Sequence, residues 1–496
     1  MSSIISMFSV LSPMTVLLTF AGVVLGTVVC SITGLTATME VAVLTSCTYG
    51  TEAAKASAML LGIFVCGVEV GSISAILLKV PGTSSAIMTT LDGYPMAQRG
   101  EGGTAIGIAT ISSFCGGIIS CIFLILGCAK LADIAAKFGY PEYFVIALFG
   151  LCIIANTGGS LLKGLLGAFL GVFSTMVGMD TLTGITRFTL GSKSLIRGLE
   201  MVPILIGLFG VSEILNQLFD IKKNNIKHES IGKVFPGWKL LNKLKWTILR
   251  SSLIGTIVGV LPGAGGPIAA FVAYNTEQSL SKEPEKFGTG IPEGISAPES
   301  ANNATVGGAL VPMLALGVPG DGVTAIIMAA FAIHGFHLGP TIFSESPEIV
   351  STVYIYTIVA NIFMVTIGLI AARYFARLVN TDKTILIPII LMACVIGSYA
   401  ASNNVFDVYV MIFFGVLGFL MEKVGVSTSA FVLGQVLGDL METNFRSAFT
   451  MSQGSWSIFF RPITMVFWAL TVIMVVVPQI NKIVKKKKAK ATDAQK

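Results

Sequence analysis

The stretch Leu261–Pro267, which reads Leu-Pro-Gly-Ala-Gly-Gly-Pro, lies inside an apolar run that would otherwise form one continuous helix. Proline lacks a backbone N–H donor and glycine tolerates unusual backbone angles, so the helix has to break here. At membrane depth a break exposes N–H and C=O groups, which persist only where protein or a water-filled cavity satisfies them. The stretch therefore predicts a broken helix beside a cavity, if the chain spans a membrane.

The composition places the chain in a membrane. Of its 496 residues, 54% are hydrophobic and 12% are charged, about half the charged fraction of roughly 25% that soluble domains carry. Too little charge remains to cover a water-facing surface, so soluble classes are excluded and an all-α polytopic membrane protein is predicted. The eight cysteines lie in apolar stretches without a C-x-x-C pair, which indicates neither a zinc site nor a disulfide framework.

Spans of about 20 apolar residues are long enough to cross a bilayer. Four further apolar pieces are shorter, are bounded by glycine or proline, and cover residues 36–47, 83–91, 322–333 and 428–440. Short interrupted segments in matching positions of two halves indicate the broken helices of a transporter. The candidate spans are residues 8–30, 54–78, 104–128, 141–155, 161–179, 201–219, 248–273, 301–317, 349–372, 384–402, 405–421 and 457–478.

Matching segments in the two halves predict an internal repeat. The tripeptide Val80–Gly82 recurs as Val318–Gly320, and Leu205–Gly207 is answered by Val432–Gly434. The matches keep the same order along both halves, which favours a duplication over chance similarity.

The charge distribution predicts the topology. Basic residues cluster at 222–250 and at 485–488, and such clusters concentrate on the cytoplasmic side. We therefore expect two inverted repeats with broken helices, plus one extra C-terminal helix. The expected parts are residues 1–220 (first membrane repeat), 221–250 (basic cytoplasmic linker), 251–445 (second repeat), 446–480 (extra transmembrane helix) and 481–496 (basic cytoplasmic tail).

The breaks predict an anion site. A helix N-terminus carries about half a positive charge and unpaired donors, which favour a carboxylate oxygen. Thr83 and Asp321 are the expected N-caps after the two V-P-G breaks. The alternative is that these glycines only permit close helix packing. The break residues that we expect to bind an anion are Pro81, Gly82, Thr83, Ser84, Pro262, Gly263, Gly265, Gly266, Pro319 and Gly320.

A polar segment, residues 293–305, leads into the span at 301–317. Its consecutive Asn302 and Asn303 are costly in a membrane helix unless they are hydrogen-bonded. They suit carboxylate oxygens or, through their carbonyls, an ion. The alternative is a surface loop followed by a helix cap.

These motifs resemble a known family, the large membrane (permease) subunit of tripartite tricarboxylate transporters. The resemblance rests on L-P-G-x-G, A-P-E-S-A-N-N-A, L-G-V-P-G and I-H-G within Gly255–Pro340, and on Gly71–Leu78, Leu91–Ala97, Gly158–Gly164 and Trp456–Phe459. It covers nearly the whole chain.

The resemblance implies a multi-pass protein of the bacterial plasma (inner) membrane, with its C-terminus in the cytoplasm. It implies uptake of citrate, another tricarboxylate or another carboxylate by symport with a cation, Na⁺ or H⁺, and no other cofactor. A small membrane subunit and an extracytoplasmic solute-binding protein are the implied partners. The chain has no nucleotide-binding G-x-x-x-x-G-K-[ST] loop, which agrees with a gradient as the energy source.

Four charged residues depart from the family pattern: Glu40, Glu69, Lys79 and Asp321. Charges at membrane depth should be paired or should line a cavity. One hypothesis is an ion pair between Lys79 and Asp321 across the two V-P-G breaks. The other has Lys79 binding the substrate carboxylate, with Glu40, Glu69 or Asp321 as ion-coupling candidates.

Three alternatives remain open from the sequence: a carboxylate permease that acts without a binding protein, a passive channel, and a membrane enzyme. The enzyme is disfavoured because H-E-x-x-H and G-x-S-x-G are both missing. No nucleic-acid partner is expected. No metal site is expected either, because His334 and His337 have no third ligand nearby in the sequence.

Overall fold

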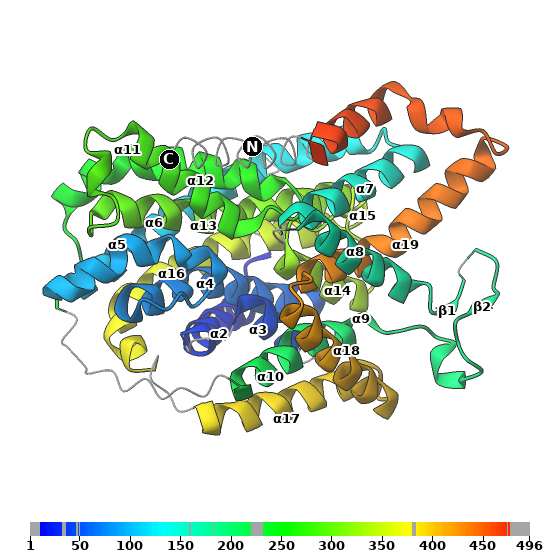
Figure 1. Ribbon diagram of the computed structural model, residues 1–496, viewed down its shortest axis with the longest axis horizontal. Helices are drawn as coiled ribbons and strands as arrows, with labels where there is room; N and C mark the ends of the chain where they lie inside the picture. The colour runs from blue at the N-terminus through cyan, green and yellow to red at the C-terminus, as the bar shows by residue number, and fades with distance from the viewer. Residues whose placement is uncertain are drawn as a thin grey trace, which may run out of the picture. The chain divides into compact units, whose positions relative to one another are not determined.

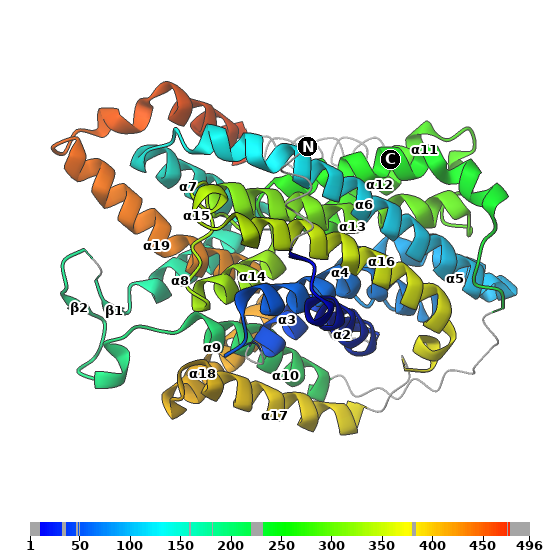
Figure 2. The same cartoon turned by 180° about the vertical axis from the view of Figure 1, so that it is seen from behind.

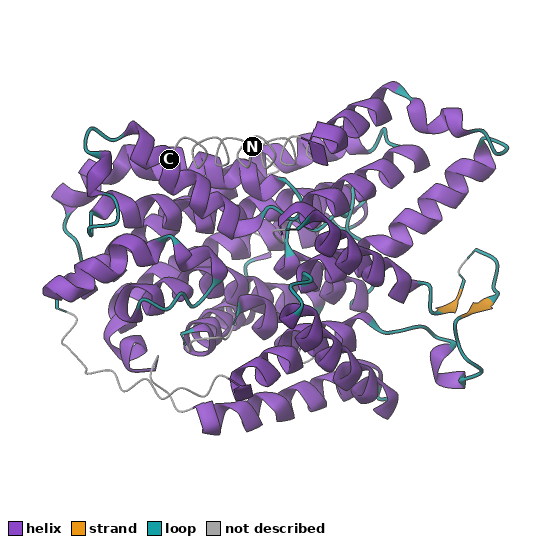
Figure 3. Ribbon diagram, in the orientation of Figure 1, coloured by secondary structure: helices purple, strands orange, loops and turns teal. Residues whose placement is uncertain are grey.

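The computed structural model describes residues 10–31, 36–45, 48, 50–157, 160–180, 182–219, 232–378, 383–473 and 475–476. Within these ranges the chain is almost wholly helical (Figure 3). The only strands in the described residues are β1 (Gly178–Met179) and β2 (Thr186–Arg187), which pair antiparallel. The predicted all-α class is confirmed.

Several helices are long and apolar enough to cross a membrane, as expected of a multi-pass protein. Among the described residues these are Pro13–Cys30, Ala53–Leu78, Thr89–Ala135, Met201–Leu218, Pro347–Ala372 and Val405–Lys423. Shorter apolar helices include Gly322–Ile333 and Pro462–Ile473.

The chain forms two compact units, and the first combines residues 1–136 with 200–423. In Figure 1 its helices α11, α12 and α13 (green) lie side by side, and they contact one another. The elements of this unit are α2 (Pro13–Cys30), α3 (Ala37–Thr45), α4 (Ala53–Leu78), η3 (Ser84–Ile87), α5 (Thr89–Met96), η4 (Ala97–Glu101), α6 (Gly102–Ala135), α9 (Met201–Leu205), η6 (Ile206–Val211), α10 (Ser212–Phe219), α11 (Trp238–Val260), α12 (Gly265–Leu280), η7 (Pro284–Lys286), α13 (Pro292–Leu316), α14 (Gly322–Ile333), α15 (Ile342–Glu345), α16 (Pro347–Leu378), α17 (Lys383–Ser402) and α18 (Val405–Lys423).

Helix α13 forms the core of this unit and is buried from Gly294 to Ala315. It packs against α6, α11 and α12, while α4 packs against α2 and α16; Figure 2 shows α6 and α16 from the other side. Glycines allow these close approaches. A Cβ on Gly116 or Gly255 would lie 2.1 Å from the carbonyl oxygen of Ser300 or Ala301. Small residues at such contacts are typical of packed membrane helices.

The second unit combines residues 137–199 with 424–496. It contains α7 (Tyr140–Thr157), α8 (Leu161–Thr175), the β1–β2 hairpin, η5 (Lys193–Leu195), α19 (Thr428–Met451) and η8 (Trp456–Phe460). Helices α7, α8 and α19 contact one another. A Cβ on Gly434 of α19 would lie 2.2 Å from the carbonyl oxygen of Ala168, so this pair also needs glycine.

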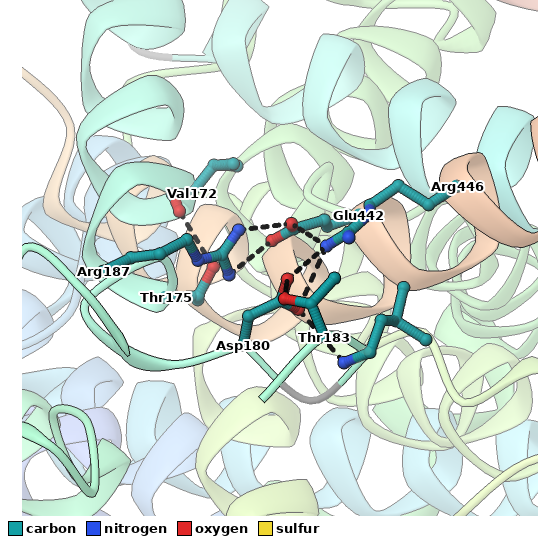
Figure 4. A network of polar contacts seen from close by, with 8 residues as sticks. Val172, Thr175, Asp180, Thr183, Arg187, Glu442 and Arg446 are labelled. Carbon is teal, nitrogen blue, oxygen red and sulfur yellow. Dashed lines mark hydrogen bonds and ion pairs between the residues drawn. The ribbon is translucent and has the colours of Figure 1, made fainter. Parts of the chain in front are cut away.

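Ion pairs fasten the hairpin of the second unit to α19 (Figure 4). Arg187 Nη1 lies 2.6 Å from Glu442 Oε1, and Arg446 Nη1 lies 2.8 Å from Asp180 Oδ2. Arg446 also contacts Glu442 at 3.0 Å. We call these four residues the hairpin clasp.

Three expected segments differ in the structure. The span at 248–273 is two helices, as the predicted break within it requires, because α11 ends at Val260 and α12 starts at Gly265. The piece at 428–440 is too short, because α19 continues to Met451. Its extension is polar and carries the clasp residues Glu442 and Arg446, whose ion pairs a hydropathy window does not detect. The piece at 83–91 is a 3₁₀ turn followed by the start of α5.

Candidate binding site at the helix breaks

The Leu-Pro-Gly stretch breaks the helix as predicted, and two of its glycines have backbone angles that require glycine. Gly263 has φ +80° and Gly265 has φ +62°, in the left-handed region that side chains disfavour. Helix α12 begins at Gly265 and runs for 16 residues. Its N-terminus therefore points out of the break and carries the partial positive charge expected there.

The two V-P-G turns fold back on the helices that precede them. Gly82 lies against Gly71 of α4, and its N–H donates to the Gly71 carbonyl oxygen at 3.1 Å. A Cβ on Gly320 would lie 2.5 Å from Cα of Ala309 in α13. In both turns the glycine contacts the residue eleven positions earlier, so the two turns are built alike.

Helix pairs in the two halves also contact at matching positions. A Cβ on Gly26 of α2 would lie 3.1 Å from the carbonyl oxygen of Ile63 in α4. A Cβ on Gly255 of α11 would lie 2.1 Å from that of Ala301 in α13. When the two repeats are aligned, Gly26 corresponds to Gly255 and Ile63 corresponds to Ala301. They support the duplication, which remains a prediction, as does its inversion.

The two breaks of the second half are joined directly. Gly263 N donates to the carbonyl oxygen of Gly320 at 2.7 Å. The bond links the Leu-Pro-Gly break to the second V-P-G turn through main-chain atoms alone. It satisfies one donor and one acceptor that the breaks would otherwise leave bare.

Three segments meet closely at Gly266, where the missing side chain leaves room only for oxygen atoms of the other two segments. The position that a Cβ on Gly266 would occupy is 2.4 Å from Asn302 Oδ1 and 2.5 Å from Ser85 Oγ. These two oxygens are therefore less than 5 Å apart, because both lie within 2.5 Å of one point. We call this place, with Ser85, Gly266 and Asn302, the Gly266 gap. It brings together η3, the start of α12 and the middle of α13.

One oxygen at the gap lacks a partner. Asn302 is wholly buried, and its Nδ2 donates to the Val68 carbonyl oxygen at 3.1 Å. Its Oδ1 has no hydrogen-bond partner among the described residues. A buried acceptor left unpaired is costly, so a ligand that carries a donor or a positive charge would be stabilised there. Nearby, Ser85 Oγ can donate or accept, and the α12 N-terminus favours an anion.

The other expected site residues lie around the breaks, and they differ in how far their side chains are exposed to solvent. Asn303 is buried, and its Nδ2 points to the Val65 carbonyl oxygen at 3.5 Å. Thr83 precedes η3 but makes no capping bond with its side chain. Pro262, Gly82, Pro319 and Gly320 are buried, whereas Lys79, Pro81 and Ser84 are exposed.

The hypothesised ion pair between Lys79 and Asp321 is not formed in this structure. Lys79 ends α4, and its Nζ lies 5.6 Å from the centre of the Tyr94 ring. Asp321 is the N-cap of α14, as expected, and its Oδ1 accepts from the N–H of Thr324 at 2.8 Å. Each charge has a local partner, so neither needs the other.

The two unusual glutamates lie in the protein interior. Glu40 on α3 is buried, and its Oε2 accepts from Cys30 Sγ at 3.1 Å. Glu69 on α4 is also buried, and its Oε1 accepts from Thr110 Oγ1 at 2.6 Å. No described hydrogen bond joins either carboxyl group to Ser85 or Asn302.

Sequence reasoning missed Ser85, Glu299 and Asp92 as residues of interest. Ser85 follows the predicted Thr83 and Ser84, and Glu299 lies one turn before Asn302, so their positions in the motifs were the available signal. Asp92 is wholly buried and binds the segment that begins α13: its Oδ1 accepts from the N–H groups of Gly290 and Ile291, at 2.7 and 3.0 Å. Tyr274 donates to its Oδ2 at 2.8 Å.

Comparison with known proteins identifies a family whose model matches most of the chain. Residues 16–433 match the model of the tripartite tricarboxylate transporter TctA family. An uncharacterized 52.8 kDa protein in the TAR-I ttuC′ 3′ region of Agrobacterium vitis is 35% identical over 450 residues, which is 90% of each chain. An uncharacterized protein in the TAR-II ttuC′ 3′ region of the same organism is 36% identical over 205 residues, covering 41% of this chain and 85% of its own length. No solved structure matches the chain.

Proposed function

The chain belongs to the tripartite tricarboxylate transporter TctA family, and from this we propose that it takes up a small organic anion across the bacterial plasma membrane. The substrate is a tricarboxylate such as citrate, or another carboxylate. Uptake is secondary and is driven by a cation gradient. The chain is the translocating subunit of a tripartite system, with a small membrane subunit and an extracytoplasmic solute-binding protein as partners.

One observation supports this proposal above the others: the Gly266 gap lies where helix breaks of both halves come together. The N-terminus of α12 supplies donors for a carboxylate without any basic side chain. Asn302 Oδ1, buried and unpaired among the described residues, supplies an acceptor for a hydroxyl or a protonated carboxyl group. A small polar anion that carries both kinds of group fits this pair.

The breaks also suit movement. Transporters commonly hold the substrate at interrupted helices near the membrane midplane and alternate access around that site. In this chain, the Gly263–Gly320 bond would keep two breaks together while the surrounding helices shift. The C-terminal basic tail, outside the described residues, is expected in the cytoplasm.

Uptake into proteoliposomes tests the function. The vesicles contain the chain together with its two partner proteins, and radiolabelled citrate, tartrate and succinate are offered with inward sodium or proton gradients. Accumulation of unchanged carboxylate above its outside concentration is expected, and ionophores that collapse the gradient should abolish it. Equilibration that continues after collapse would indicate a passive channel, and a chemically altered product would indicate an enzyme.

Omitting one component at a time tests the assembly. Loss of uptake without the binding protein is expected for a tripartite system. Unchanged uptake without it would indicate a permease that acts alone.

A further inference from the structure

Two wholly buried carboxyl groups face the same side of α6. Neither belongs to the residues that form the Gly266 gap. Glu69 on α4 is 1% exposed and Glu299 on α13 is 0% exposed. Thr110 Oγ1 donates to Glu69 Oε1 at 2.6 Å. Thr89 Oγ1 donates to Glu299 Oε1 at 2.5 Å, and Ser113 Oγ to Glu299 Oε2 at 3.3 Å. Hydroxyl groups therefore hold both acids.

The two acids are neighbours. Thr110 and Ser113 are three residues apart on α6, which places them on one face with their Cβ atoms about 5–6 Å apart. Each binds one of the acids, so the two carboxyl groups lie against the same face of α6. Among the described residues, neither acid forms an ion pair with a lysine, arginine or histidine. We call them the Glu69–Glu299 pair.

Such a pair is costly when both groups are ionised. Two buried negative charges without a cation have lost their hydration and repel each other. Neighbouring carboxyl groups in this position favour a state in which they share one proton, because a second negative charge repels the first. A proton needs no coordination shell, whereas the hydroxyl hydrogens that point at these oxygens leave fewer lone pairs for a metal cation.

Asn302 connects the pair with the Gly266 gap. It lies one turn after Glu299 on α13, and its Nδ2 donates to the carbonyl oxygen of Val68, the residue before Glu69. Its Oδ1 faces Gly266 and has no partner in the described part of the chain. One side chain thus lies between the acids and the proposed anion site.

Several other titratable groups on the helices packed around α4 and α13 have partners of their own. Glu40 on α3 is bound by Cys30 of α2, and Cys66 of α4 contacts Thr27. Asp92 of α5 is bound by Tyr274 of α12, and Glu277 of α12 pairs with Arg250 of α11. Ion pairs also join Glu293 of α13 to Lys243 of α11, and Lys55 of α4 to Glu52.

Further titratable groups on these helices are Lys79 at the end of α4, Tyr94 on α5, Lys130, Asp133, Cys115, Cys121 and Cys128 on α6, Lys239 and Lys245 on α11, Asp321 and His334 at the ends of α14, and Glu348, Tyr354, Tyr356 and Tyr374 on α16.

We propose that the Glu69–Glu299 pair is the proton-binding site that couples uptake to a proton gradient, holding a transported proton while the anion occupies the Gly266 gap. This rests on the proposed function. With the proton bound, the pair repels an anion less strongly; with the proton released, its second negative charge disfavours the anion. Proton and anion therefore stabilise each other's binding, and the coupling is reciprocal. The proton comes from water on one side and returns to water on the other, so the chemistry is a reversible O–H bond on one carboxyl oxygen.

Infrared spectroscopy tests the pair without any substrate. Purified protein in nanodiscs is titrated with acid and base while the carbonyl stretch of protonated carboxyl groups is recorded. The band of a buried carboxylic acid that responds to pH is expected, and Glu69→Gln and Glu299→Gln should each remove or shift it. Glu345→Gln, at an exposed glutamate, is the matched control. The proposal is overturned if the band and its titration are the same in both variants as in the parent.

Transport tests the coupling. In proteoliposomes of the complete system, an inward proton gradient of one pH unit should raise citrate accumulation about tenfold for each coupled proton. Glu69→Gln should remove this increase, and Glu345→Gln, at an exposed glutamate outside the pair, should retain it. If Glu299→Gln does not fold, Glu69→Gln alone decides the result.

The outcomes separate this inference from the proposed function. Citrate uptake that follows sodium and ignores the proton gradient would refute the proton site and leave carboxylate transport intact. Absence of uptake for every carboxylate would refute the function, and the infrared titration would still decide whether the pair holds a proton.

Discussion

The carboxylate of Asp92 on α5 binds main-chain N–H groups 198 residues later in the chain: its Oδ1 lies 2.7 Å from the nitrogen of Gly290. The same oxygen accepts from Ile291, and Gly288 also donates to the carboxylate. These bonds fix the segment from which α13 starts, at Pro292. Because α13 carries Glu299 and Asn302, Asp92 positions both proposed sites without touching either.

Replacing Asp92 by asparagine should loosen this segment. The amide would turn one acceptor into a donor that faces backbone N–H groups, and leaving buried donors unpaired costs about 1–3 kcal/mol. We expect lower thermal stability and faster hydrogen exchange at residues 288–294. Asp133→Asn, at an exposed position on α6, is the control and should change neither. Equal exchange at 288–294 in the parent and Asp92→Asn proteins would contradict the role given to Asp92.

Replacing Gly266 by alanine should fill the gap. The new methyl group would lie 2.4 Å from Asn302 Oδ1 and 2.5 Å from Ser85 Oγ, so a neighbour or the ligand has to move. We expect carboxylate uptake to fall at least about tenfold, equivalent to about 1.4 kcal/mol of lost binding. Gly127→Ala is the matched control, because a Cβ there meets no atom within 4 Å. Full uptake by Gly266→Ala would place the substrate elsewhere.

Reversing the charges of Lys79 and Asp321 should not restore lost activity. The structure gives each residue its own local role, over the Tyr94 ring and as the N-cap of α14. Asp321→Lys should reduce stability by about 1 kcal/mol through loss of the cap, whether or not Lys79→Asp accompanies it. The test is to measure carboxylate uptake and melting temperature for the two single variants and the double variant. Recovery in the double variant would show that the two charges meet in another state.

The hairpin clasp should weaken in acid. Hydrogen bonds from Thr183 and then from Arg446 hold the pKa of Asp180 below its ordinary value. A lowered folded-state pKa stabilises the fold above the unfolded value of about 3.9, and this stability is lost as the pH falls below it. Hydrogen exchange at residues 178–187, corrected for its intrinsic pH dependence, should therefore accelerate below about pH 4. In Asp180→Asn the exchange should already be fast at neutral pH, with little further change in acid.

The helix breaks could be predicted from the sequence because their cause is local. Pro262 lacks a backbone donor and the next residue, Gly263, has φ +80°, so the helix ends there, and Gly317 and Asp321 mark the end of one helix and the start of the next. The Gly266 gap could be predicted only in part. Asn302 stood out as a polar residue in an apolar span, but its contact with Ser85 depends on how distant segments pack.

The Glu69–Glu299 pair could not be predicted from the sequence. Glu69 stood out as a charge in an apolar helix, yet its neighbour Glu299 comes from α13, and Thr110 and Ser113 from α6 link the two. No periodicity or spacing in one segment carries that information, because it arises when three helices meet. The same holds for Asp92, whose bonds reach a loop of no regular structure.

The bond between Gly263 and Gly320 uses only atoms that every amino acid except proline possesses at those positions. Substitutions of side chains beside this bond can therefore alter the surroundings of the two interruptions while the tether between them persists.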